Sequence, residues 1–112
     1  VKICSVVNMT AHNTKSVKQK NKNVSSIEKF TLDLWETDIA VGLTGAWLGS
    51  KHFGSLIANN KDGGSIVNIS SDLGLIGPDQ RIYSKKGINK NKGPVKPVTY
   101  SVVKSGIIGR TR

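Results

Sequence analysis

The sequence predicts an α/β protein built on a parallel sheet. Two short runs rich in β-branched residues are separated by a long stretch in which apolar residues recur every three or four positions. A strand, a helix and a second strand in this order form a right-handed crossover unit that joins two parallel strands. The length of 112 residues suits a single domain, and a hydrophobic fraction of 37% is compatible with a modest core.

The first expected strand lies within residues 1–9. Its run Val-Lys-Ile-Cys-Ser-Val-Val has the length and composition of a strand buried on one or both faces, and it stops at Asn8. Cys4, the single cysteine, is expected to be a small buried side chain and cannot form an internal disulfide, so a cytoplasmic location is the simpler expectation. Residues 10–26, rich in Asn, Lys, Ser and Thr, are expected to form an exposed loop.

A long amphipathic helix is predicted from Leu34 to about Asn59. Its N-cap is expected at Asp33, with Glu36 completing a capping box three residues later. The helix would contain four interior glycines: Gly42, Gly45, Gly49 and Gly54. Each glycine costs about 0.8–1 kcal/mol relative to Ala in a helix. Their number therefore predicts the close approach of another backbone or a ligand.

A second buried strand is predicted over Ser65–Ile69, after a Gly-Gly break. The following connection, from about Asp72 to Pro97, is too long for a bare turn and is typical of a surface excursion near a site. The last helix is expected to begin at Tyr100 with Thr99 as its cap. Small residues four apart on this helix would suit packing against a neighbouring helix, and they are Ser101, Ser105 and Gly109.

Tyr100 and Lys104 would lie one turn apart on the same face of this last helix. A phenol has an ordinary pKa of about 10, but a nearby cation favours its phenolate form, so Tyr100 could act as a general acid or base. By itself the pair is weak evidence, since such pairs occur in many helices as ordinary surface residues. In an open parallel sheet, however, ligands bind beyond the carboxyl ends of the strands, where Ser70 and Ser71 lie.

The strand motif Gly-Ser-Ile-Val-Asn-Ile-Ser-Ser with Gly74, together with the Tyr-x-x-x-Lys helix, closely resembles the short-chain dehydrogenase/reductase family. The resemblance runs from about Val6 to Arg112. It implies an NAD- or NADP-dependent oxidoreductase that transfers a hydride between the nicotinamide and a small carbonyl or alcohol substrate. It also implies that residues 1–112 form one partial, Rossmann-like, doubly wound NAD(P)-binding domain with a loop insertion at about residues 79–97.

The resemblance also assigns roles to residues. Ser71, followed three residues later by Gly74, corresponds to the catalytic serine that hydrogen-bonds the substrate. Tyr100 corresponds to the proton donor or acceptor. Lys104 would hold the nicotinamide ribose and lower the pKa of the tyrosine, so Tyr100 and Lys104 would both contact the cofactor as well. Ser70 is interpreted as structural.

Two positions depart from the family pattern. The strand-end Asn-Asn-Ala-Gly motif falls on residues 8–11 and matches only at Asn8, to which cofactor contact is carried over. The helix asparagine that positions a water in the proton relay aligns with Gly42, so a water or another residue must replace it or the relay is weaker. The chain also lacks the first strand and the Gly-rich phosphate-binding turn, so we expect it to be a fragment that is inactive alone.

The insertion between Ser71 and Tyr100 contains a second tyrosine, Tyr83. The residue four positions after it is Gly87, which supplies no cation, so Tyr83 is not expected to be catalytic. Asp72 and Asp79 flank the expected site and are interpreted as solvated. His12 and His52 have no metal-ligand spacing, so packing or solvated roles are expected and no metal site is predicted.

The formal net charge of +10 raises the alternative of a basic nucleic-acid-binding module. The excess lies in two stretches interpreted as solvated loops: Lys15, Lys18, Lys20, Lys22 and Lys29, and then Arg81, Lys85, Lys86, Lys90, Lys92 and Lys96. Aromatic residues make up only 5% and do not interleave with the lysines, so no stacking platform is predicted. A non-catalytic remnant of the dehydrogenase fold is the second alternative. We expect no nucleic-acid or membrane partner, and a homo-oligomer at full length.

Overall fold

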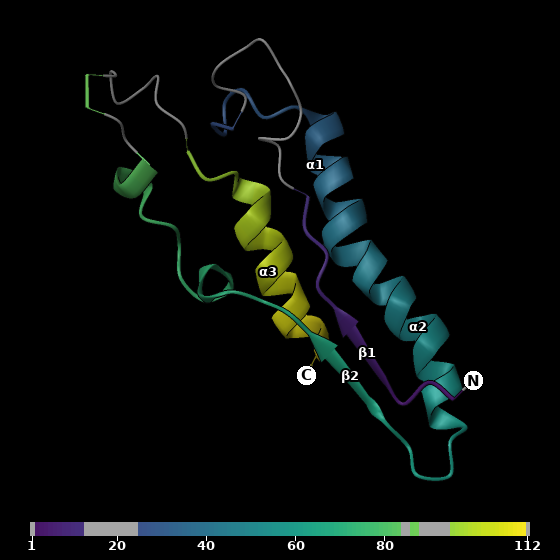
Figure 1. The fold of residues 1–112 in the computed structure, drawn as a ribbon. Coiled ribbons are helices and arrows are strands. Elements are labelled where there is room, and N and C mark those ends of the chain that lie inside the picture. Colours follow the sequence, from purple (N-terminus) through teal and green to yellow (C-terminus); the bar gives the residue numbers. More distant parts are fainter. Residues whose placement is uncertain (1, 13–24, 84–85, 88–94, 112) are drawn as a thin grey trace.

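The computed structural model describes residues 2–12, 25–83, 86–87 and 95–111, and it confirms the α/β class. Figure 1 shows two strands side by side with their arrowheads pointing the same way, and a long helical rod running along them. The strands are β1 (Ser5–Asn8) and β2 (Ser65–Asn68), and the helices are α1 (Leu32–Ile39), α2 (Gly45–Ala58) and α3 (Val98–Thr111). A π-helical turn, Ala40–Thr44, joins α1 to α2, and these three together form the helical rod, residues 32–58. Short 3-10 turns lie at Asp72–Gly74 and Gln80–Tyr83.

The two strands pair in parallel, from Ser5 opposite Ser65 to Asn8 opposite Asn68. The pairing continues at one end, where the Ile69 N–H donates to the Asn8 carbonyl over 2.9 Å. The helical rod connects the strands, so the predicted crossover unit is confirmed. Because the strands are parallel, both carboxyl ends lie at the same edge of the sheet.

The strands are less buried than the sequence predicts. Along each strand exposed and half-buried residues alternate, and Val7 and Val67 are 56% and 45% exposed. Helix α2 lies against the face that carries Asn8 and Ile66, where these side chains approach Gly49 and Gly54. Alternate side chains of a strand point to opposite faces. One face of the sheet is therefore open in the described part of the chain.

Cys4 is exposed, so its prediction as a buried side chain was wrong. It comes just before β1 and lies outside the paired residues Ser5–Asn8. The apolar composition of the run indicated the strand, but it did not show where the covered part of the strand would begin.

The long helix begins two residues before the predicted start. Thr31 is the N-cap, with an extended backbone and a hydroxyl that accepts from the Leu34 N–H over 3.4 Å. The predicted capping box of Asp33 and Glu36 was therefore wrong. Asp33 instead lies in the first helical turn, where a carboxylate interacts favourably with the helix dipole.

Helix α3 also begins earlier than predicted, at Val98. Thr99 is therefore inside the first turn and is not the cap. It is only 1% exposed, and its hydroxyl donates to the carboxylate of Asp38 on α1. The Thr99 side chain, which the sequence predicts as a helix cap, is thus hydrogen-bonded to a residue of another helix.

The core lies between the helical rod and α3. It consists of Ala46, Val103 and Ile107, with Ile39 and Leu43 packed against them. Gly42 lets the helices approach, because a Cβ there would lie 2.5 Å from Val103 Cγ1. The close neighbour at Gly42 is thus a side chain of another element and not the backbone or ligand that the sequence predicts, and Gly49 and Gly54 likewise lie against the side chains of Asn8 and Ile66. None of the described helices combines the length and apolar character needed to cross a bilayer.

Candidate active site

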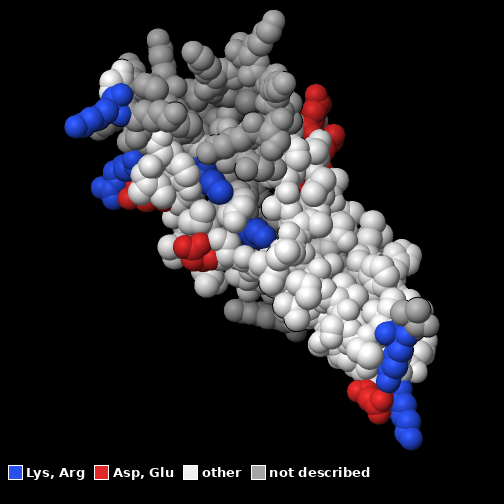
Figure 2. Space-filling model, viewed as in Figure 1, with Lys and Arg blue, Asp and Glu red and all other residues white. Residues whose placement is uncertain are grey.

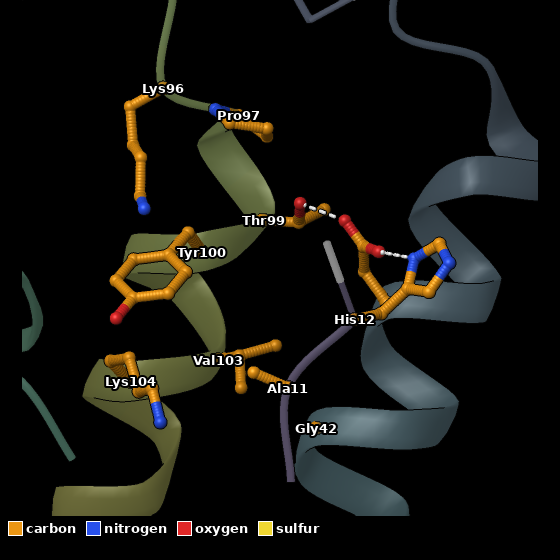
Figure 3. A pocket seen from close by; sticks show the side chains of 10 residues that line it. Ala11, His12, Gly42, Lys96, Pro97, Thr99, Tyr100, Val103 and Lys104 are labelled. Atoms are coloured by element: carbon orange, nitrogen blue, oxygen red, sulfur yellow. Dashed lines mark hydrogen bonds and ion pairs between the residues drawn. The ribbon is translucent and has the colours of Figure 1, made fainter. Parts of the chain in front are cut away.

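A cavity of about 140 Å³ lies between α1 with its π-helical turn, α3 and the segment that follows β1 (Figure 3). A cavity of roughly this size, about 150 Å³, can hold a benzene ring. The space therefore suits a ring or a small substrate. The residues that line it are Ala11, His12, Asp38, Gly42, Lys96, Pro97, Thr99, Tyr100, Val103 and Lys104.

Tyr100 and Lys104 meet at one wall of this cavity. The Lys104 ammonium lies 5.8 Å from the centroid of the Tyr100 ring, within the range of a cation–π interaction. Lys104 is only 5% exposed, and its Nζ donates to the Ile69 carbonyl over 2.8 Å. This hydrogen bond fixes the ammonium at the carboxyl end of β2, the edge where ligands bind in open parallel sheets.

A second cation, Lys96, lies closer to the same ring. Its Nζ is 3.7 Å from the Tyr100 centroid, and Figure 3 shows its side chain descending alongside the ring from the chain that leads into α3. Gln80 holds the Lys96 backbone at two points, accepting from its N–H over 2.9 Å and donating to its carbonyl over 3.2 Å. Lys96 is half-buried, so the interpretation of this residue as part of a solvated loop was wrong.

The other wall carries a buried carboxylate with two partners. Asp38 is 7% exposed; one of its oxygens lies 2.6 Å from His12 Nδ1, and the other accepts from the Thr99 hydroxyl. Both partners offset the desolvation of the carboxylate. No pattern in the sequence predicts this cluster, because its three residues lie on separate segments. The only local signal was the position of Asp38, an acidic residue directly before Ile39 on the apolar face of the helix.

Ser71 is not among the residues that line the cavity. Its hydroxyl donates to Asp72 Oδ1 over 2.7 Å and accepts from the Leu73 N–H over 3.2 Å, so it caps the 3-10 turn. The hydrogen bond from Ser71, and then the one that the Leu73 N–H donates to Asp72 Oδ1 over 2.8 Å, lower the pKa of Asp72.

The turn that carries Ser71 packs directly on α3 beside Lys104. Ser70 Oγ donates to the Lys104 carbonyl over 2.7 Å, and Ser105 Oγ donates to the Gly74 carbonyl over 2.7 Å. A Cβ at Gly74 would lie 2.8 Å from the Lys104 carbonyl, so only glycine fits there without displacement. The structural interpretation of Ser70 agrees with its contact. Ser71 is thus held next to the turn of α3 that bears the lysine, with its hydroxyl turned to Asp72.

Asn8 belongs to a separate polar network. Its amide donates to Asn68 Oδ1 over 2.8 Å and to Ser50 Oγ over 3.2 Å. Arg110 completes the network, donating to the same two oxygens over 2.6 and 2.9 Å and to the Ala46 carbonyl over 3.0 Å. The network joins both strands to α2 and α3, and it does not line the cavity.

The remaining predicted positions lie away from the cavity. Tyr83 ends the second 3-10 turn, and Asp79 pairs with Arg81 over 2.7 Å. Hydrogen bonds from the side chain of Arg81, and then the hydrogen bond from its backbone N–H, lower the pKa of Asp79. Within the described ranges, no group of three or more His, Cys, Asp or Glu side chains is placed to hold a metal ion.

Charged side chains are scattered over the face shown in Figure 2. Blue groups occur at several separate places, with red groups beside several of them, and the described residues form no continuous basic stripe on this face. Eight basic residues lie outside the described part: Lys15, Lys18, Lys20, Lys22, Lys85, Lys90, Lys92 and Arg112.

No protein-family model matches the chain, and no curated protein matches it significantly. The α/β crossover and the cavity that contains Tyr100, Lys96 and Lys104 are the features that bear on its function.

Proposed function

We propose that the chain carries the acid–base machinery of an NAD(P)-dependent oxidoreductase of the short-chain dehydrogenase/reductase type, acting on a carbonyl or alcohol. One observation carries the proposal. The Tyr100 ring lines a ring-sized cavity and has the Lys96 and Lys104 ammonium groups 3.7 and 5.8 Å from its centroid. A partial Rossmann-like sheet is part of the proposal, and the parallel pair β1–β2 supports it.

In carbonyl reduction, Tyr100 would donate its hydroxyl proton to the oxygen on which negative charge develops. The phenolate left behind would be stabilised by both ammonium groups, since nearby opposite charges favour the ionised form of an acid. Lys104 is nearly fully buried, so its charge is less screened by water than that of a surface lysine. In alcohol oxidation the same phenolate would accept the proton.

The residues present fit the nicotinamide end of the dinucleotide. An ammonium has three donors, and Lys104 uses one of them on the Ile69 carbonyl, so two remain for ribose hydroxyls. Tyr100 and Lys104 would hold this end, and a bound nicotinamide supplies or accepts the hydride. Asn8 would contribute by fixing the end of β1 through its bonds to Asn68 and Ser50. We assign none of the described residues to the phosphates.

Ser71 would orient the substrate oxygen. To do so its hydroxyl must turn from Asp72, to which it donates over 2.7 Å. The turn itself is well placed, because Ser70 and Gly74 on either side contact the backbone of Lys104.

A non-catalytic member of the same fold is the second candidate. Gly42, at the family's relay asparagine, lies against Val103, so a side chain there would require Val103 to move. The engaged hydroxyl of Ser71 and the engaged amide of Asn8 point the same way. Activity decides between the two candidates.

The test is an assay of the chain, and of any longer polypeptide encoded around it, with NADH and NADPH against a panel of carbonyl compounds. We expect Tyr100→Phe to lower kcat/KM by about 10²–10⁴-fold, the usual contribution of a general acid. Tyr83→Phe is the matched control, because Tyr83 does not line the cavity, and it should keep the parental rate. An active parent whose Tyr100→Phe variant is equally active would refute the proposal.

A further inference from the structure

We propose that the cavity recognises a carboxylate on its substrate, and that Lys96 is the residue that binds it. This inference rests on the proposed function for the reacting group, a carbonyl or alcohol, and it adds the chemical class: a small 2-oxo or 2-hydroxy acid. Recognition by Lys96 can nevertheless be measured without turnover.

The charges that line the cavity favour an anion. Asp38 is its one carboxylate among the described residues, and both of its oxygens are already engaged, by His12 and by Thr99. The two ammonium-bearing side chains of Lys96 and Lys104 line the same cavity, on the wall that carries Tyr100. A small anion entering the cavity therefore meets two cations and a carboxylate that is already hydrogen-bonded.

The two lysines are not equivalent. The Lys104 ammonium is held by the Ile69 carbonyl over 2.8 Å. The Lys96 ammonium lies over the face of Tyr100, and no carboxylate in the described part of the chain is within ion-pair distance of it. All three donors of Lys96 are therefore available to a ligand, at the ring that would carry out proton transfer.

The backbone of Lys96 is also held in position before any ligand arrives. Gln80 holds both its N–H and its carbonyl, and the next residue is Pro97, whose ring restricts the backbone. On its other side Lys96 borders a second cavity of about 380 Å³, whose lining includes the apolar side chains of Pro78, Val95 and Val98 and also Glu28. Because Lys96 is half-buried, its charge is less screened by water than that of a fully exposed lysine, and it interacts more strongly with an anion.

The experiment compares lactate with lactamide, which share a carbon skeleton and a hydroxyl but differ in charge. Binding is followed by NMR on the ring signals of Tyr100, in a Tyr83→Phe background so that one tyrosine remains. We expect lactate to bind at least about tenfold more tightly than lactamide, as befits a charge-assisted hydrogen bond in place of a neutral one. In Lys96→Gln the ratio of the two Kd values should fall to near one.

Two further variants make the result specific. Lys96→Arg keeps the charge and should keep the preference for lactate. Lys51→Gln is the matched control: it removes the same charge from a lysine whose Nζ lies 5.2 Å from the centroid of an aromatic ring, Trp47, but outside the cavity. It should leave the ratio unchanged. Amide NMR spectra of the variants confirm that each is folded.

The proposal is overturned if lactate does not bind, if lactate and lactamide bind equally, or if Lys96→Gln and Lys51→Gln alter the ratio to the same extent. Failure of the oxidoreductase assignment looks different. In that case lactate still binds through Lys96 but no cofactor-dependent turnover occurs. Turnover with equal preference for neutral and acidic substrates in the parent and in Lys96→Gln would instead remove the inference alone.

Discussion

At the scale of the residue, Gly42 controls the contact between the helical rod and α3. A Cβ at this position would lie 2.5 Å from Val103 Cγ1, in the core. We predict that Gly42→Ala lowers the free energy of unfolding by about 1–3 kcal/mol, the usual range for overpacking a core. Urea denaturation, monitored by circular dichroism, measures this change in the free energy of unfolding.

Gly45→Ala is the control for this substitution. A Cβ at Gly45 would meet only the Ala40 carbonyl, at an ordinary 3.5 Å, so alanine should be neutral or should stabilise the helix by up to about 1 kcal/mol. Adding Val103→Ala to Gly42→Ala should make the two effects non-additive. Strictly additive effects would show that the side chains do not meet.

The hydrogen bond between Ser71 and Asp72 leads to a second prediction at this scale, which concerns the titration of Asp72. The hydrogen bond from Ser71, followed by that from the Leu73 N–H, holds the pKa of Asp72 below its ordinary value of 3.8. A carboxyl whose pKa is lowered by folding stabilises the fold above its unfolded pKa, and this contribution is lost as the pH falls through the lowered value. In an NMR titration, Ser71→Ala should therefore raise the midpoint of Asp72 toward 3.8.

Asp79 provides the internal control for that titration. Its pKa is also lowered, but by Arg81, so Ser71→Ala should leave its midpoint where it is and Arg81→Gln should raise it. If Ser71→Ala shifts both carboxyls alike, or neither, the hydrogen bond between Ser71 and Asp72 is not the cause.

At the scale of the element, Arg110 fastens α3 to the rest of the fold. It donates to Asn68 on β2 and to Ser50 and Ala46 on α2. Arg110→Leu would remove three hydrogen bonds from a charged donor, and a hydrogen bond to a charged group contributes about 1.5–3 kcal/mol. We predict a loss of stability of that order in urea denaturation.

Arg81→Leu is the matched control for Arg110→Leu. The Arg81 side chain is 91% exposed and pairs with Asp79 on the surface, and such pairs contribute little to stability. Its removal should leave the denaturation midpoint close to that of the parent. Equal effects of the two substitutions would contradict the bridging role of Arg110.

The elements themselves were largely predictable, because their signals are local. The strand–helix–strand order and the last helix follow from hydrophobic periodicity, and the structure confirms them. The helix caps were not predictable in detail. At the first helix, Thr31 and Asp33 are both good capping residues, and the sequence does not distinguish them. At α3, a tertiary contact decides that Thr99 binds Asp38 and does not cap its own helix.

The site was predictable only where its residues share one element. Tyr100 and Lys104 follow from the spacing of a helix. Lys96 is also four residues from Tyr100, but Pro97 and the start of α3 lie between them, so helical spacing does not apply. The pairing of His12 with Asp38 joins segments 26 residues apart, and no local pattern encodes such a contact.

At the scale of the whole molecule, the described sheet is covered on one face only. The Cα radius of gyration of the structure is 17.2 Å, which is larger than the value of about 13 Å expected for a compact chain of this length. We predict that Ile66→Ala, on the face near Gly54, lowers the free energy of unfolding by about 1–3 kcal/mol. Its strand neighbour Val67, on the open face, should tolerate alanine with little change in the same denaturation experiment.

The central claim is that the phenol of Tyr100 shares one cavity with the ammonium-bearing chains of Lys96 and Lys104. The most direct test is a set of NOE measurements from the ring protons of Tyr100 to the lysine ε-protons, in the Tyr83→Phe variant. The structure predicts a strong NOE to Lys96, whose Nζ is 3.7 Å from the ring centroid, and a weaker one to Lys104, at 5.8 Å. A Tyr100 ring that shows no NOE to either lysine would contradict the claim.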